Sequence, residues 1–151
     1  MSKEFQNQPQ PGICETAFAV GQFFVSDLYA YYQDTYRGVL GKVQVEAVDY
    51  IRRSGRASVS DLARTLNIPK QHASKIAAKL EELGLVSRSP NPLDARGAVF
   101  SLTEEGSRFV SEHIEQSNRH LQEILERCGK EEQEELLRAL QTVARVLELP
   151  F

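Results

Sequence analysis

Cysteine and long apolar runs are scarce in this chain of 151 residues, and each scarcity excludes a class of protein. The two cysteines, Cys14 and Cys128, are too few for a disulfide framework, so we expect a reducing cytoplasm. The longest apolar stretch, residues 17–25, is interrupted by Gly21 and Gln22 and falls short of the roughly 18–20 apolar residues of a membrane span. No basic region followed by an apolar stretch stands near the N-terminus, so we expect neither a secretory signal nor a membrane partner.

The sequence motifs of common enzymes are missing as well. The chain has no Gly-x-Gly-x-x-Gly, no Gly-Lys-Ser/Thr loop, no His-Glu-x-x-His and no Gly-x-Ser-x-Gly. Its only histidines are His72, His113 and His120, and a metal held by the last two would need further ligands. The sequence therefore predicts neither an enzyme nor a cofactor or metal site.

Charge is plentiful but unevenly distributed. The net charge is −3, yet residues 52–96 carry nine basic and four acidic side chains, while residues 1–51 and 97–151 are both net acidic. A basic segment between acidic ends suits a surface that faces phosphate. Scattered solvated charge would give the same count.

The apolar spacing predicts a mainly α-helical protein with a small β-hairpin wing. We expect residues 1–12 to form a flexible tail and residues 13–39 to form an N-terminal dimerisation helix, because two faces of that helix are apolar. Residues 40–102 are expected to form a winged helix-turn-helix, in which two short helices precede a hairpin. Residues 103–151 would supply two C-terminal dimerisation helices.

Caps and breakers set the expected element boundaries. Ser60 is a plausible N-cap for a short helix, and Pro69 can open the next helix, which runs to about Leu83 and ends at Gly84. Thr103 is a good N-cap for the helix that follows the hairpin. Within the hairpin, strands are expected at residues 85–88 and 98–102, with Pro90 and Pro92 in the loop because proline cannot donate a ladder hydrogen bond.

The helix expected over residues 70–83 has two different faces. At about 100° per residue, one face is apolar and the opposite face is short, polar and basic. The apolar set is Ala73, Ile76, Ala77 and Leu80, and the polar side carries Gln71, Ser74, Lys75 and Ala78. A helix that reads a DNA groove needs such a face, although any amphipathic helix with a solvated side shows the same pattern.

The most specific motif follows the hairpin loop. Asp94 and Arg96 stand at the expected tip, where an arginine can enter a minor groove, and Leu102-Thr103-Glu104-Glu105-Gly106 comes soon after. Together with Ser60-Asp61-Leu62-Ala63 and the residues from Leu80 to Val86, this pattern resembles the MarR family of bacterial transcriptional regulators. The resemblance covers about residues 40–110 closely.

The resemblance implies a homodimer that binds a pseudo-palindromic double-stranded DNA operator, often as a repressor relieved by a small ligand or by oxidation. The residues that it implies for DNA contact are Lys70, Gln71, His72, Ser74, Lys75, Arg88, Asp94 and Arg96. Pro69 stands where many relatives carry an acidic or hydroxyl residue, so we expect this helix start to be capped differently. Gln71 and His72 replace the commoner small hydroxyl residues, so the operator sequence does not follow from that of relatives.

The regulatory signal is open between several hypotheses. The aromatic residues Phe18, Phe24, Tyr29, Tyr32 and Tyr36 either line a pocket for a small aromatic or lipophilic effector or form the dimer core. Cys14 either senses peroxide, as in relatives whose N-terminal cysteine is hydrogen-bonded to tyrosines, or is inert. A winged-helix protein-interaction module that does not read DNA is a further alternative.

Overall fold

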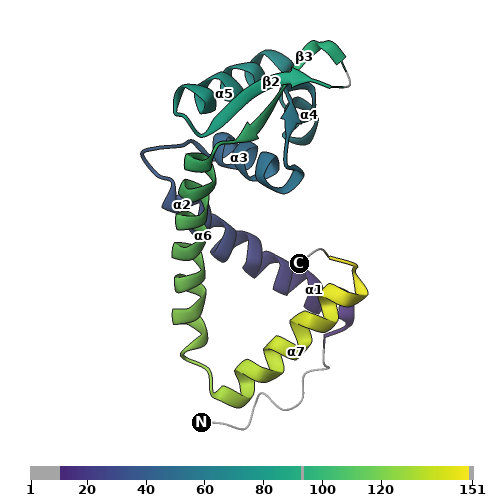
Figure 1. Ribbon diagram of the computed structural model, residues 1–151. Helices are drawn as coiled ribbons and strands as arrows, with labels where there is room; N and C mark the ends of the chain where they lie inside the picture. The colour runs from purple at the N-terminus through teal and green to yellow at the C-terminus, as the bar shows by residue number, and fades with distance from the viewer. Residues whose placement is uncertain (1–10, 93, 150–151) are drawn as a thin grey trace.

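A computed structural model describes residues 11–92 and 94–149, with the side chains of residues 94–96 outside that description. The chain forms a winged lobe from which helical arms extend (Figure 1). The elements are α1 (Ile13–Phe23), the π-helix η2 (Phe24–Tyr29), α2 (Ala30–Thr35), α3 (Lys42–Ser54), β1 (Ala57–Ser58), α4 (Val59–Thr65), α5 (Lys70–Glu82), β2 (Val86–Asn91), β3 (Asp94–Leu102), α6 (Glu104–Leu125) and α7 (Lys130–Val146). The predicted fold class is confirmed, while most of the expected tail, residues 1–12, lies outside the described residues.

The N-terminal arm is one helical path with a change of winding in its middle. Between α1 and α2, the π-helical turn of η2 replaces the single α-helix that the apolar spacing predicted. One wide turn shifts the apolar stripe only slightly, so the sequence pattern does not distinguish the two windings. No residue of α1 is buried, whereas Tyr32 of α2 and Tyr36 just beyond it are buried. The arm therefore joins the core only at its C-terminal end.

The hydrophobic core lies in the winged lobe. Side chains of α3, α4 and α5 fill it, and Val48, Leu62 and Leu80 are completely buried. Tyr36 and Val110 extend the same cluster to the junction of α2 with α6. Within residues 11–92 and 94–149, no helix is both long and apolar enough to cross a membrane.

The wing is a three-stranded antiparallel sheet with β3 in the centre and the order β1-β3-β2. The sequence did not predict β1, because two residues are too few for an alternating pattern. Pro90 lies within β2, opposite Ala98, and not in the expected loop. An edge strand tolerates the missing N–H of a proline, and the strand register shifts directly after Pro90.

The sequence predicted Ser60 as the N-cap of α4. In the structure, Ser58 caps the start of this helix. Ser58 Oγ accepts a hydrogen bond from the Asp61 N–H at 3.1 Å, and the Asp61 carboxylate accepts one from the Ser58 N–H at 3.0 Å. The acidic residue three positions after Ser58 completes this capping box, which is why the helix begins earlier than expected. The hydrogen bond from the Ser58 side chain also lowers the pKa of the Asp61 carboxyl.

Thr103, the predicted N-cap of α6, fastens that helix to the lobe. Its Oγ1 accepts a hydrogen bond from the Gly106 N–H at 2.9 Å and donates one to the Gly84 carbonyl at 2.6 Å. The Thr103 N–H donates to the Leu85 carbonyl at 3.1 Å. A Cβ on Gly106 would overlap the backbone of Leu85, so the helix approaches this closely only because residue 106 is glycine. The Leu-Thr-x-x-Gly motif therefore has a structural role, joining α6 to the turn between α5 and β2.

Candidate nucleic-acid interface

The two predicted faces of α5 are present in the structure. Its apolar set, from Ala73 to Leu80, is buried in the core. The opposite side is exposed and presents the amide, hydroxyl and ammonium groups of Gln71, Ser74 and Lys75. The exposed Ala78 lies on the same side and adds little bulk. Lys70 and His72, also expected to contact DNA, are exposed in the first turn at the edges of the apolar face, and His72 lines a groove together with residues 41–44 at the start of α3. The polar face of α5 has the chemistry that base edges and phosphates require.

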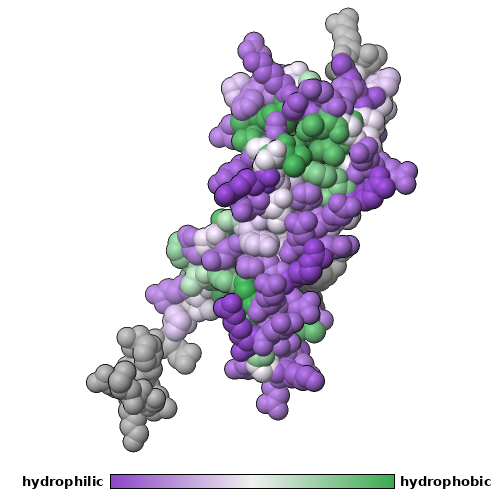
Figure 2. All heavy atoms as spheres, turned by 90° about the vertical axis from the view of Figure 1, so that its left-hand side faces the viewer, coloured by the Kyte–Doolittle hydropathy of each residue, from purple (hydrophilic) through white to green (hydrophobic). Residues whose placement is uncertain are grey.

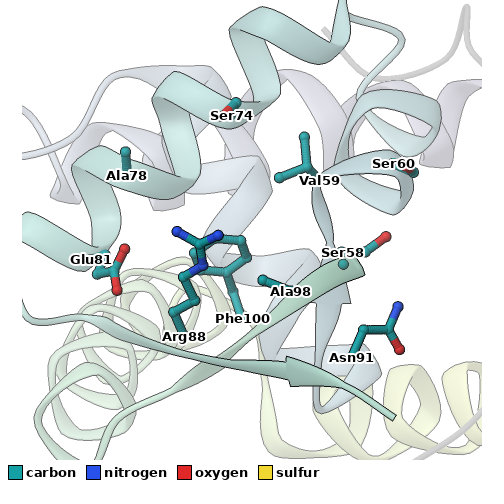
Figure 3. A pocket seen from close by; sticks show the side chains of 11 residues that line it. Ser58, Val59, Ser60, Ser74, Ala78, Glu81, Arg88, Asn91, Ala98 and Phe100 are labelled. Atoms are coloured by element: carbon teal, nitrogen blue, oxygen red, sulfur yellow. The ribbon is translucent and has the colours of Figure 1, made fainter. Parts of the chain in front are cut away.

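A cleft of about 310 Å³ lies between α5 and the wing (Figure 3). It is lined by Ser58, Val59 and Ser60 at the start of α4, by Ser74, Ala78 and Glu81 of α5, and by Arg88, Asn91, Gly97, Ala98 and Phe100 of the wing. Three lining residues carry hydroxyl groups, one carries an amide and one carries a guanidinium, which are all groups that hydrogen-bond phosphate oxygens.

Arg88 owes its place in the cleft to the sheet register. Arg88 of β2 lies opposite Phe100 of β3, and such cross-strand partners share one face of a sheet. Phe100 is buried, while Arg88 is exposed and rises from β2 toward α5 in Figure 3. The structure therefore brings Arg88 to the same cleft as Ser74 of α5. Sequence reasoning missed the other charged lining residue, Glu81, which lies seven positions after Ser74 on the same side of the helix.

The predicted contacts at the wing tip are described only in part. The backbone of Asp94 and Arg96 lies in β3, close to where β2 ends. Their side chains are outside the described residues, so their contact with DNA stays a prediction.

Comparison with known proteins finds relatives of the winged lobe. Residues 38–97 match the model of the MarR family. This part of the chain is therefore similar to MarR-family proteins. An uncharacterized HTH-type transcriptional regulator, YdgJ of Bacillus subtilis, is 26% identical over 101 residues, which span 67% of this chain and 62% of that protein.

Several solved structures share the fold over most of the chain. The transcriptional regulator Tm0710 of Thermotoga maritima has a TM-score of 0.80 at 20% identity and covers 89% of this chain and 95% of its own. Wild-type MarR of E. coli has a TM-score of 0.68 at 20% identity over 95% of this chain and 100% of its own. A mutant MepR of S. aureus bound to an oligodeoxyribonucleotide has a TM-score of 0.64 at 16% identity over 87% and 97%. YdgJ and Tm0710 are both named as transcriptional regulators.

The aromatic residues predicted to line an effector pocket are only partly brought together in the structure. Tyr32 and Tyr36 pack edge to face in the core, and their hydroxyl groups are joined by a hydrogen bond of 2.9 Å. The ring of Tyr29 lies tilted beside that of Tyr32, with the ring centroids 5.9 Å apart. Phe18 and Phe24 lie apart from this cluster, with 69% and 37% of their surfaces exposed. The three tyrosines therefore support the core, and the two phenylalanines belong to an uncovered face of the arm.

A cavity of about 620 Å³ lies where the N-terminal arm meets α6 and the start of α3. Its lining is mostly polar and includes Asp27, Asp34, Arg37, Lys42 and His120. The ring of His120 stacks on Tyr31 at a centroid distance of 3.9 Å. Two turns earlier on α6, the ring of His113 stacks on that of Tyr36, with a centroid distance of 3.9 Å. Both histidines therefore tie α6 to the N-terminal arm, which is a packing role.

Cys14, the residue of the redox hypothesis, is exposed in the first turn of α1. The peroxide-sensing relatives are expected to have a hydrogen bond between this thiol and a tyrosine. Within the described part of the chain, Cys14 makes no such hydrogen bond. Cys128 is also exposed and free.

A groove of mixed apolar and charged lining on the lobe bears on the alternative of a protein-interaction module. It has a volume of about 510 Å³ and is lined by Val39, Leu83, Leu85 and Phe109 together with the charged Glu105, Arg108 and Glu112. Figure 2, which views the left-hand side of Figure 1, shows apolar atoms gathered on the winged lobe among charged ones.

Proposed function

We propose that this protein is a dimeric, sequence-specific DNA-binding regulator that represses transcription from a pseudo-palindromic operator. One observation carries the proposal: the exposed polar face of α5 adjoins a cleft whose wing side supplies Arg88 (Figure 3). A helix with this face fits the major groove, and a wing beside it reaches the adjacent minor groove. MepR, which shares the fold, was solved with an oligodeoxyribonucleotide. Such a regulator works where the DNA is, in the cytoplasm.

Dimerisation is proposed from the uncovered apolar surface of the arms. Leu136, Leu140, Val143 and Leu147 recur at steps of three and four along α7 and are between 40% and 62% exposed. In α1, Phe18 and Phe23 are also exposed. Exposed apolar surface of this extent is typical of an interface with another subunit. A second copy of the chain would cover it and place two winged lobes on the two half-sites of an operator.

Release by a small molecule is the regulatory part of the proposal. The 620 Å³ cavity supports it, because the cavity lies at the junction of the arm with the lobe and has the size of a small-molecule site. A ligand held there would contact α2, α3 and α6 together. Oxidation of Cys14 is the alternative signal, to be tested by comparing operator release by organic hydroperoxide in the wild-type protein and in Cys14→Ser.

Fluorescence-anisotropy titrations test the DNA-binding function. The probes are a duplex from the region upstream of the gene that encodes the protein and a scrambled duplex of equal length, each at several salt concentrations. We expect Gln71→Ala to weaken binding to the specific duplex by about 1–3 kcal/mol and to leave the salt dependence nearly unchanged, because an amide reads base edges. Arg96→Ala should weaken binding to both duplexes and reduce the salt slope by about one contact per subunit.

Two results would count against this function. If the wild-type protein binds the upstream duplex no better than the scrambled one, the regulator is not sequence-specific at that site. If Arg96→Ala changes neither affinity nor salt slope, the wing does not touch DNA.

A further inference from the structure

One carboxylate lies in the cleft between α5 and the wing. Glu81 lines it from α5, and Arg88 lines it from β2 (Figure 3). These two are the charged members of the lining set. A protein surface that binds a polyanion is expected to carry cations and neutral hydrogen-bonding groups, so the position of Glu81 asks for an explanation.

If the protein docks on DNA as a winged helix, a strand of the DNA backbone lies in this cleft. If α5 lies in a major groove and the wing enters the neighbouring minor groove, the sugar–phosphate strand that separates those two grooves passes between α5 and the wing. Ser58, Ser74 and Arg88 line that space with groups that bind phosphate. The carboxylate of Glu81 would meet the same phosphates.

The charge of Glu81 is not compensated in the free protein. Within the described part of the chain, neither Glu81 nor Arg88 takes part in an ion pair. The next residue, Glu82, pairs with Lys79 at 3.1 Å and does not line the cleft. Two neighbouring glutamates of α5, both exposed, therefore differ in their place relative to the cleft and in their pairing with a lysine.

We propose that Glu81 limits the affinity of the cleft for the phosphate backbone by direct repulsion. The inference rests on the proposed function, because it needs a duplex docked on α5 and the wing. Like charges a few ångströms apart oppose docking, and salt screens that opposition. Binding away from the operator depends almost wholly on phosphate contacts, so the repulsion falls on it in full, whereas base contacts from residues such as Gln71 are untouched.

The test compares Glu81→Gln with Glu82→Gln, which make the same change of charge and shape one residue apart. Anisotropy titrations use the upstream and scrambled duplexes at about 50 to 200 mM salt, the range over which phosphate contacts are most visible. We expect Glu81→Gln to tighten binding to both duplexes by about three- to tenfold at low salt and to steepen the salt dependence, because a repulsion that salt relieves has been removed. Glu82→Gln should tighten binding less than Glu81→Gln does, because Glu82 lies outside the cleft and is paired with Lys79.

A double variant shows whether the repulsion is direct. The tightening caused by Glu81→Gln should persist when it is added to Arg88→Gln, since the carboxylate acts on phosphate itself. Loss of the effect in that background, or a Glu81→Gln affinity no higher than that of Glu82→Gln, would overturn the inference. Circular dichroism checks that all variants are folded. If the wild-type protein binds neither duplex, the proposed function fails; if it binds and Glu81→Gln does not tighten binding, only this inference fails.

Discussion

At the scale of single residues, the tightest constraint in the molecule is the absence of a side chain at Gly106. Its Cα lies against the backbone of Leu85, where a Cβ would overlap the carbonyl oxygen and carbon. Backbone atoms cannot rotate aside as a flexible side chain can, so the structure must shift to admit a methyl group. Gly21 is a contrasting case, because a Cβ there would meet nothing within 4 Å.

We therefore expect Gly106→Ala to destabilise the protein by at least about 1–3 kcal/mol, the cost of forcing extra volume into a packed site. Gly21→Ala should be neutral or stabilising by up to about 1 kcal/mol, because alanine favours a helix interior. Urea unfolding followed by circular dichroism measures both. Equal stability of the two variants would show that α6 does not approach Leu85 as described.

Residue-scale chemistry also explains which parts of the site the sequence predicted. The faces of α5 follow from helical geometry alone, so the buried position of Ala73 and the exposed position of Lys75 were correct. The cleft could not be predicted from the sequence, because it depends on the strand register that sets Arg88 opposite Phe100. An aromatic stripe gives no sign of whether neighbouring elements close over it, so the sequence left Tyr36 open between an effector pocket and a core, and the structure places it in the hydrophobic cluster.

At the scale of elements, the start of α4 depends on a reciprocal pair of hydrogen bonds between Ser58 and Asp61. The sequence offers two serines for the cap, and only the one placed three residues before an acidic side chain is used. Helix boundaries from sequence are uncertain by such small shifts wherever two capping residues are close together.

Replacing each serine separately tests the cap. Ser58→Ala should reduce the free energy of unfolding by about 1 kcal/mol, the usual cost of losing a capping hydroxyl. Ser60→Ala, in the first turn of the same short helix, should change it by less than about 0.5 kcal/mol. Denaturant unfolding of the two variants decides between them, and a larger loss for Ser60→Ala would return the cap to the position that the sequence favoured.

The contact between the N-terminal arm and the lobe includes two tyrosine hydroxyl groups, Tyr32 and Tyr36, that lose their protons only at high pH. Burial raises the pKa of Tyr36 above the ordinary value of 10.0, and burial likewise raises that of Tyr32. A raised pKa in the folded state means that the contribution of this tyrosine to stability is complete below pH 10.0 and is lost as the pH rises above it. The packing of α2 against the core, which includes this hydroxyl pair, is therefore expected to weaken at alkaline pH.

We expect the stability of the wild-type protein to fall more steeply between about pH 9 and pH 11 than that of Tyr36→Phe, by up to about 1.4 kcal/mol per pH unit above the ordinary pKa. Urea midpoints at several pH values in this range measure the slopes. Tyr31→Phe, at a residue that is 39% exposed, is the matched control and should keep the wild-type slope. Identical slopes for Tyr36→Phe and the wild type would contradict the prediction.

At the scale of the whole molecule, the lobe has a closed core, while the arms expose apolar side chains along both α1 and α7. The sequence predicted these arms because one helix carries two apolar faces. A single chain of this length has too few other residues to cover both faces. The winding change at η2 did not show in that pattern, because it alters the backbone without altering which residues are apolar.

The mass of the protein in solution tests the dimer. Sedimentation at low micromolar concentration should give about twice the 17.0 kDa of one chain. Leu140→Lys should shift the protein toward monomers, because it places a charge in the proposed apolar interface. Gln141→Lys, one residue along α7 and turned away from the apolar stripe, should leave the mass unchanged. A folded wild-type species of 17.0 kDa under these conditions would contradict the dimer.

The attachment of α6 at Thr103 has a mechanical consequence. Because the end of α5 and the root of the wing are both bound to this one residue, a tilt of α6 carries the recognition helix and the wing together as a block. In a dimer, such a tilt alters the distance between two blocks and leaves the shape of each intact. B-DNA repeats its grooves about every 34–36 Å, so the operator acts as a ruler of fixed pitch. In the proposed dimer, a lever of this kind would switch DNA binding by spacing, because a few ångströms of travel would put one block out of phase with its groove.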